Sequence, residues 1–188
     1  VQVTVISSIS NKDNKLEPGK ELSIRPEPCF LLSLSIPRST IRFKISVKDC
    51  FDEYCRPEVL DGENKWYNEK SKQKEEVFKQ HLFWSLPEIL IVDLKRFNKN
   101  GTKIQVPIQL DMNLSMAPYM VGYNKDDANY ELYGVCNHSG SCSGGHYTAH
   151  VKCADNKWYL FNDTIVSEDK KFSGRDNVLG YSLFYKKV

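Results

Sequence analysis

The stretch Gly144-Gly-His-Tyr-Thr-Ala-His-Val-Lys152, followed by Trp158-Tyr-Leu-Phe-Asn-Asp163, predicts two neighbouring β-strands. Both segments are rich in aromatic and β-branched residues, which favour strands. The composition of Ala154-Asp-Asn156, between them, is typical of a tight turn. The two strands should therefore pair as an antiparallel hairpin, and this hairpin determines both the fold class and the candidate site.

The length of the turn sets the register of this hairpin. With a three-residue turn, Cys153 faces Lys157, and His146 shares a face of the sheet with Asn162, in a diagonal position. A two-residue turn at Asp155-Asn156 shifts the register by one residue and brings Asp163 to the side of His146 instead. The sequence favours the three-residue turn but leaves Asn162 and Asp163 as alternatives.

Alternation along the first strand divides its side chains between two faces. His146, Thr148 and His150 share one face, and we expect the more apolar set to point towards the core: Tyr147, Ala149, Val151 and Cys153.

An imidazole beside a side-chain oxygen is an arrangement suited to nucleophilic catalysis by a thiol. The oxygen accepts the proton of one ring nitrogen and fixes the ring, so the other nitrogen can act as a base. Asn162 or Asp163 could supply this oxygen to His146. Gly144 and Gly145, just before the histidine, allow close approach of another main chain and unusual backbone angles.

The rest of the chain predicts an α+β fold that is mostly antiparallel β. Short apolar runs are separated by Asn, Asp, Gly and Pro, as in strands joined by turns. Ser46-Val-Lys-Asp49 has the pattern of a capping box, and Pro57 ends the short helix that follows. The expected strands are Gln2–Ile6, Cys29–Ser35, Ile89–Phe97, Tyr130–Cys136, His146–Lys152, Lys157–Phe161 and Tyr181–Lys186.

Composition narrows the class of protein. The chain has 188 residues, no internal repeat and no linker, so we expect a single domain over residues 1–188. The net charge of +2 gives no reason to expect a nucleic acid or a membrane as a partner. The six cysteines occur without a signal segment, which favours reduced thiols and a cytoplasmic or nuclear location.

Several segments, taken in chain order, resemble the ubiquitin-specific protease family of cysteine deubiquitinases. Together they run through much of the chain in the order and spacing of the family. The segments are Phe30-Leu-Leu-Ser-Leu-Ser-Ile-Pro37, Glu58-Val-Leu-Asp-Gly-Glu-Asn-Lys-Trp-Tyr67, Leu86-Pro-Glu-Ile-Leu-Ile-Val-Asp-Leu-Lys-Arg-Phe97, Tyr133-Gly-Val135, Ser139-Gly-Ser141, Ser143-Gly-Gly-His-Tyr-Thr-Ala149, Trp158-Tyr-Leu-Phe-Asn-Asp163 and Gly180-Tyr-Ser-Leu-Phe-Tyr185.

The resemblance implies a papain-like palm sheet with one or two short helices and with β fingers formed by residues 1–28 and 56–82. It implies hydrolysis of an isopeptide or peptide bond after the terminal glycine of ubiquitin, and ubiquitin or a ubiquitinated protein as partner. His146 would be the general base and Asn162 its orienting residue, with Asp163 as a substitute. The loops Asn98–Lys103 and Ser139–Gly145 would border the channel for the ubiquitin tail, and the implied substrate-binding residues are Ser143, Gly144, Gly145 and Tyr147.

The chain departs from the family pattern in two places. The family's cysteine box should precede every segment quoted above, and none of the six cysteines takes the place of the nucleophile. We therefore expect the helical thumb to be largely missing and the isolated chain to be inactive. In the fingers, Ser7, Ser10 and Asn68-Glu-Lys-Ser71 stand where many members have Cys-x-x-Cys pairs, so we expect no zinc and no other cofactor.

Two alternatives remain open at this point. The chain could be a non-catalytic ubiquitin-binding module in which the His–Asn pair is a relic. A small metal site built from Cys136, His138, Cys142 and His146 is the other, although this spacing is not that of a standard zinc knuckle.

Overall fold

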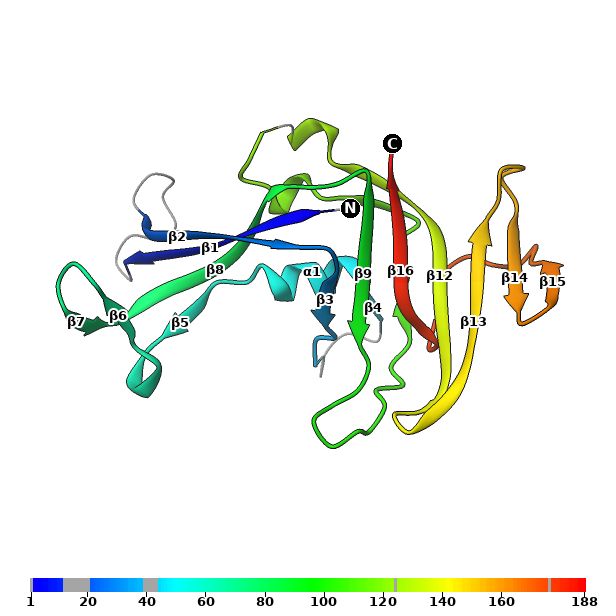
Figure 1. Ribbon diagram of the computed structural model, residues 1–188, viewed down its shortest axis with the longest axis horizontal. Coiled ribbons are helices and arrows are strands. Elements are labelled where there is room, and N and C mark those ends of the chain that lie inside the picture. Colours follow the sequence, from blue (N-terminus) through cyan, green and yellow to red (C-terminus); the bar gives the residue numbers. More distant parts are fainter. Residues whose placement is uncertain (1, 12–20, 39–43, 124, 176) are drawn as a thin grey trace.

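The computed structural model describes residues 2–11, 21–38, 44–123, 125–175 and 177–188. Figure 1 shows an elongated molecule in which two β-sheets lie on either side of the helix α1 (Val47–Tyr54). The larger sheet is made of β3 (Leu32–Ser35), β9 (Ile89–Lys95), β11 (Asn113–Ser115), β12 (Asn129–Ser141), β13 (Gly144–Lys152), β14 (Trp158–Asn162), β15 (Ile165–Glu168) and β16 (Gly180–Lys187).

The strand order of this sheet is β15-β14-β13-β12-β16-β9-β3, and β11 also pairs with β12. Its neighbouring strands are antiparallel, except that β3 is parallel to β9. The fold class predicted from the sequence, α+β with mostly antiparallel strands, is therefore confirmed.

The second sheet extends away from α1 to the left in Figure 1. It is antiparallel with the order β2-β1-β8-β5, where the strands are β1 (Val3–Asn11), β2 (Glu21–Cys29), β5 (Glu58–Leu60) and β8 (Val77–Ser85). A hairpin of β6 (Trp66–Asn68) and β7 (Gln73–Glu75) lies at its far end. The short strands β4 (Ile45–Ser46) and β10 (Ile108–Gln109) form a parallel pair.

The helix α1 begins with the predicted capping box. The Asp49 backbone N–H donates to Ser46 Oγ at 3.1 Å, and the Ser46 backbone N–H donates to Asp49 Oδ2 at 2.8 Å. Val47, Cys50 and Phe51 on one side of the helix are fully buried. The core therefore lies between α1 and one face of the larger sheet. Short 3-10 turns lie at Gly62–Asn64, Ala117–Tyr119 and Lys125–Asp127.

One face of the larger sheet carries the core, and the register shows which residues belong to it. Starting at His150, pairing leads across the sheet through Val135, Leu183 and Val92 to Leu32. These four apolar residues are at most 2% exposed. His146 lies four positions before His150 on β13, so its side chain emerges on the same face.

The sequence-based assignment of the two faces of β13 was therefore wrong. Tyr147, Ala149, Val151 and Cys153 lie on the face opposite the core, and Tyr147 is 56% exposed. Alternation determines which residues share a face, but the position of the core is set by where α1 packs. A second difference is that Cys29–Ser35 is not one strand. The chain bends at Phe30 and Leu31, because β2 and β3 belong to different sheets.

A buried arginine, Arg96, ties the end of β9 to neighbouring segments. Its guanidinium donates to the carbonyl oxygens of Gly180 at 2.6 Å, Ile104 at 3.1 Å, Val106 at 3.0 Å and Asn177 at 3.1 Å. The side chain is fully buried, and this burial lowers the pKa of Arg96 to about 10. Arg96 thus fixes the segment between β9 and β10, which borders the candidate site.

None of the helices in the described part of the chain has the length and apolar character that crossing a bilayer requires.

Candidate active site

The hairpin of β13 and β14 has the three-residue turn that the sequence favoured. Val151 pairs with Tyr159 and Lys152 with Trp158, and the Cys153 backbone N–H donates to the Lys157 carbonyl at 2.9 Å. Asn156 in the turn has a φ of 62°, a left-handed conformation that Asn tolerates better than most residues.

This register brings His146 and Asn162 together. The distance from His146 Nε2 to Asn162 Oδ1 is 2.6 Å. An amide oxygen only accepts hydrogen bonds, so Nε2 carries the proton and Nδ1 is left as the basic nitrogen. His146 is exposed and Asn162 is half-buried, so the imidazole is accessible to a reacting group on the core side of the sheet.

Asp163, the alternative partner, lies elsewhere. It occupies the turn between β14 and β15, where Asn162 pairs with Ile165. Asp163 has a φ of 51° and is exposed. The hydrogen bonds of the described residues include none between Asp163 and His146. The structure thus brings Asn162, rather than Asp163, to the imidazole.

The four residues implied in substrate binding, Ser143, Gly144, Gly145 and Tyr147, are all exposed and surround the start of β13. A Cβ atom on Gly145 would lie 2.3 Å from the ring of His138, so β12 and β13 approach closely here. A Cβ atom on Gly144 would meet nothing within 4 Å. Neither glycine has a positive φ.

The structure does not place Tyr147 on the same face as His146. Its ring lies on the opposite face, 4.7 Å from the ring of His138, which also contacts Phe97 and Tyr181. Lys103 Nζ donates to the His138 carbonyl oxygen and lies 3.2 Å from His138 Nδ1. Burial and then the Lys103 charge lower the pKa of His138. The end of the sheet therefore has an imidazole on each face.

The two loops implied to border the channel are in contact. A Cβ atom on Gly101, in the Asn98–Lys103 loop, would lie 2.8 Å from Cys142 Sγ, at the turn between β12 and β13. Ser141 and Ser143 are hydrogen-bonded through their hydroxyls at 2.9 Å in the same turn. The loops thus form a continuous rim next to His146.

A polar network on the same face of β13 as His146 was not predicted from the sequence. Asn137 Nδ2 donates to His150 Nδ1 at 2.9 Å, and His150 Nε2 lies 3.2 Å from Asp169 Oδ2. Phe172 stacks on the His150 ring at 4.5 Å. Burial lowers the pKa of His150, although Asp169 acts against this. The sequence did show that His150 shares a face with His146, but β15 and the segment after it were not predicted.

None of the six cysteines is an activated thiol beside the imidazole of His146. All six are free, and burial raises the pKa of Cys50 and of Cys55 to about 12. Burial also raises the pKa of Cys29 and of Cys136. Cys142 is exposed at the β12–β13 turn. The hydrogen bonds of the described residues include none between a cysteine and His146.

Among the described residues, no group of three or more His, Cys, Asp or Glu side chains could hold a metal ion. In the β6–β7 hairpin, Asn68 and Ser71 both donate to the Glu75 carboxylate, and on β1 Ser10 Oγ is buried without a partner among the described residues. Cys136 and His138 point to the face of β12 opposite His146, which separates the members of the metal set suggested by the sequence.

Comparison with known proteins gives a consistent picture. The family model described as "Ubiquitin carboxyl-terminal hydrolase" matches residues 3–185. The chain is 38% identical over 151 residues to ubiquitin carboxyl-terminal hydrolase 12 of Saccharomyces cerevisiae, which covers 75% of this chain. It is 35% identical over 159 residues to ubiquitin carboxyl-terminal hydrolase 10 of Arabidopsis thaliana, which covers 80% of this chain.

Among solved structures, the chain is similar to one in the SAGA Ubp8/Sgf11/Sus1/Sgf73 DUB module bound to ubiquitin aldehyde. The TM-score is 0.81 at 26% sequence identity, and the match covers 100% of this chain and 41% of the other. The chain spans only 12% of the yeast relative and 17% of the Arabidopsis relative. It therefore corresponds to a part of each of these proteins.

Proposed function

The chain belongs to the ubiquitin carboxyl-terminal hydrolase family, and from this premise we propose that it supplies the basic half of a thiol-dependent deubiquitinase. The observation that carries the proposal is the 2.6 Å contact between His146 Nε2 and Asn162 Oδ1. It holds the ring so that Nδ1 can accept a proton from a thiol. Asn162 is the orienting residue, and Asp163 serves the neighbouring turn.

The nucleophilic sulfur comes from a segment outside these 188 residues. Four of the six thiols have a raised pKa, which keeps them protonated and weakly nucleophilic. The incoming thiol has to approach the face of the larger sheet on which His146 and the core both lie. The segment that carries it would thus dock beside α1, over the part of β12–β14 that α1 leaves open.

The reaction proceeds by two acyl transfers. The thiol proton moves to His146 Nδ1, and the thiolate attacks the carbonyl carbon of the terminal glycine of ubiquitin, whose bond to the amine nitrogen then breaks. The resulting imidazolium then donates its proton to the leaving amine, which leaves an acyl-thiol intermediate. Water, deprotonated by the same nitrogen, hydrolyses this intermediate and restores the thiol.

Ubiquitin is held by two parts of the chain. The tail passes along the rim formed by the loops Asn98–Lys103 and Ser139–Gly145, where Ser143, Gly144 and Gly145 expose main chain to it. Tyr147 contacts the tail on the opposite face, before the tail crosses the end of the sheet towards His146. The second sheet and the hairpin of β6 and β7 form the fingers, which grip the globular body of ubiquitin. The six free thiols fit a cytoplasmic or nuclear location.

Ubiquitin with a thiol-reactive group at its C-terminus tests the proposal on the complete protein. We expect one covalent adduct, with the modified cysteine outside the 188 residues. An adduct on one of the six cysteines of this chain would contradict the external sulfur. No adduct while His146 is intact would favour a non-catalytic ubiquitin-binding module.

A further inference from the structure

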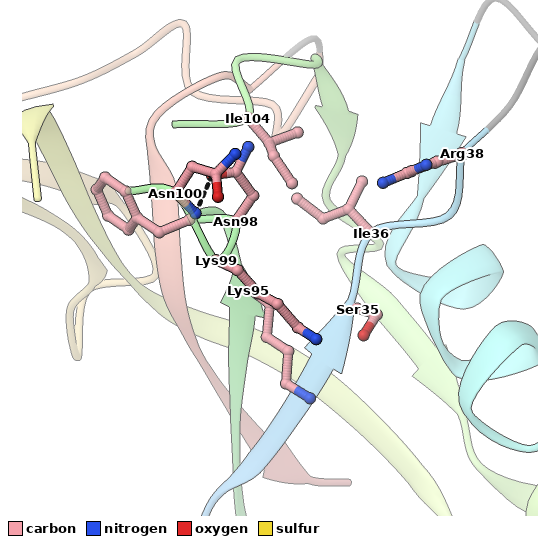
Figure 2. A pocket seen from close by; sticks show the side chains of 9 residues that line it. Ser35, Ile36, Arg38, Lys95, Asn98, Lys99, Asn100 and Ile104 are labelled. Atoms are coloured by element: carbon pink, nitrogen blue, oxygen red, sulfur yellow. Dashed lines mark hydrogen bonds between the residues drawn. The ribbon is translucent and has the colours of Figure 1, made fainter. Parts of the chain in front are cut away.

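A hollow of about 580 Å³ lies where the parallel strands β3 and β9 end side by side. Figure 2 shows that one wall comes from the end of β3 and the residues after it, and the other from the end of β9 and the loop that follows. The half-buried Ile104 and the buried Ile36 give the hollow an apolar surface. Apolar as well as polar side chains therefore line the hollow.

Three cationic side chains, Arg38, Lys95 and Lys99, line this hollow, and none of the described residues that line it is an Asp or Glu. The ion pairs among the described residues include none of these three cations. In Figure 2, Lys95 and Lys99 extend in the same direction, towards Ser35, while Arg38 reaches in from the opposite wall. Like charges gathered in a concave, partly apolar site focus a positive potential there, which favours an anion.

Neutral donors complete the lining. Asn98 Oδ1 already accepts from the backbone N–H groups of Asn100 and Thr102, at 3.0 and 2.9 Å. The Asn98 Nδ2 group has no partner among the described residues, so it can donate to a ligand. Ser35 and Asn100 add a hydroxyl and an amide. The hollow thus combines many donors with apolar surface, a combination that suits an oxyanion attached to an organic body.

We propose that this hollow binds a phosphate monoester, with the phosphate between Arg38, Lys95 and Lys99 and the organic body against Ile36 and Ile104. A phosphate monoester carries a charge of about −1.5 to −2 at neutral pH and three acceptor oxygens, which match three cations better than a single carboxylate does. Arginine adds a planar fork of donors suited to phosphate.

Two sources share this chemistry: a phosphorylated side chain of a protein, and a small phosphorylated molecule. The position of the hollow does not distinguish these two sources. It does place the ligand beside the candidate active site. The loop that forms one wall touches the β12–β13 turn through Gly101 and Cys142. A ligand in the hollow would therefore support one of the two loops that form the rim next to His146.

Isothermal titration calorimetry of the complete protein with phenyl phosphate, inorganic phosphate and benzoate compares the affinities of the hollow for these three ligands. We expect phenyl phosphate to bind in a saturable manner, at least tenfold more tightly than either of the other two. Equal affinity for inorganic phosphate would contradict a role for Ile36 and Ile104, and equal affinity for benzoate would contradict phosphate recognition. A peptide with one central phosphotyrosine, compared with free phenyl phosphate, then separates the two sources: tighter binding of the peptide assigns the hollow to protein ligands, and weaker binding assigns it to small molecules.

Charge-removing variants locate the site. Lys95→Met and Lys99→Met should each weaken binding of phenyl phosphate about tenfold, whereas Lys70→Met, an equal change on an exposed lysine of the β6–β7 turn, should leave it unchanged. Equal losses in all three variants would reveal only a general charge effect and would overturn the proposal. Binding should persist in His146→Ala, so failure of this inference is distinguishable from failure of the proposed catalytic role.

Discussion

His146 Nε2 and Asn162 Oδ1 lie 2.6 Å apart, although the two residues belong to different strands and the turn between these strands is only three residues long. The contact depends on that turn length, because one residue fewer would present Asp163 instead. The candidate pair is therefore a consequence of hairpin register. Changes at Asn162 and Asp163 should have very different effects.

The first prediction compares these two neighbours. Asn162→Ala removes the oxygen that holds the imidazole, so the rate of ubiquitin hydrolysis by the complete protein should fall about a hundredfold. Asp163→Asn keeps a side chain that tolerates the left-handed turn, and the rate should stay within about threefold. The rates are measured with ubiquitin carrying a fluorogenic C-terminal group. A larger loss for Asp163→Asn would show that the imidazole uses the carboxylate.

The second prediction concerns Arg96. Arg96→Leu leaves four backbone carbonyl oxygens without their donor, and we expect a loss of about 3 kcal/mol or more in the free energy of unfolding. Arg56→Leu is the control, because Arg56 forms an exposed ion pair with Glu53 that contributes less than about 1 kcal/mol. Urea unfolding measures both values. Similar losses in the two variants would mean that the buried guanidinium does not hold the loop.

The third prediction is a loss of stability in mild acid. Burial lowers the pKa of His150 and of His81, so below the ordinary histidine pKa of about 6.5 the unfolded chain binds more protons than the folded chain. Acid then favours unfolding, and the melting temperature should fall between pH 7.5 and pH 5.5. His150→Gln keeps a hydrogen-bonding side chain but does not titrate, so its melting temperature should fall less over the same range. An equal fall would exclude His150 as a contributor.

The fourth prediction tests the core under α1. Phe51 is fully buried and contacts the rings of Tyr119 at 5.6 Å and Phe83 at 6.1 Å. Phe51→Ala should lower the free energy of unfolding by about 3–5 kcal/mol. Phe30→Ala removes a ring that is 68% exposed and should change this free energy by about 0.5 kcal/mol or less. Comparable losses would place the core elsewhere.

Local patterns in the sequence were sufficient for part of this structure. The capping box at Ser46 and Asp49 involves residues three positions apart, and the hairpin of β13 and β14 is a contact between adjacent strands. Short-range rules of propensity and turn length cover both cases. The fold class followed from the same rules, together with the family resemblance.

Long-range contacts were not accessible in this way. Arg96 finds one of its partners 84 positions away at Gly180, and no local pattern indicates such a contact. The face of β13 that joins the core was assigned wrongly, because alternation cannot tell which side α1 will cover. Asp169 meets His150 only because β15 folds back next to β14, and β15 was not predicted.

The most direct test of the central claim is the steady-state rate of the complete protein with His146→Ala, measured together with its affinity for ubiquitin. We expect the rate to fall by about a thousandfold or more, because no base remains to deprotonate the thiol, while the affinity stays within about twofold. Because His146 is exposed, the fold should not change. A rate that survives the substitution would contradict the role of this imidazole.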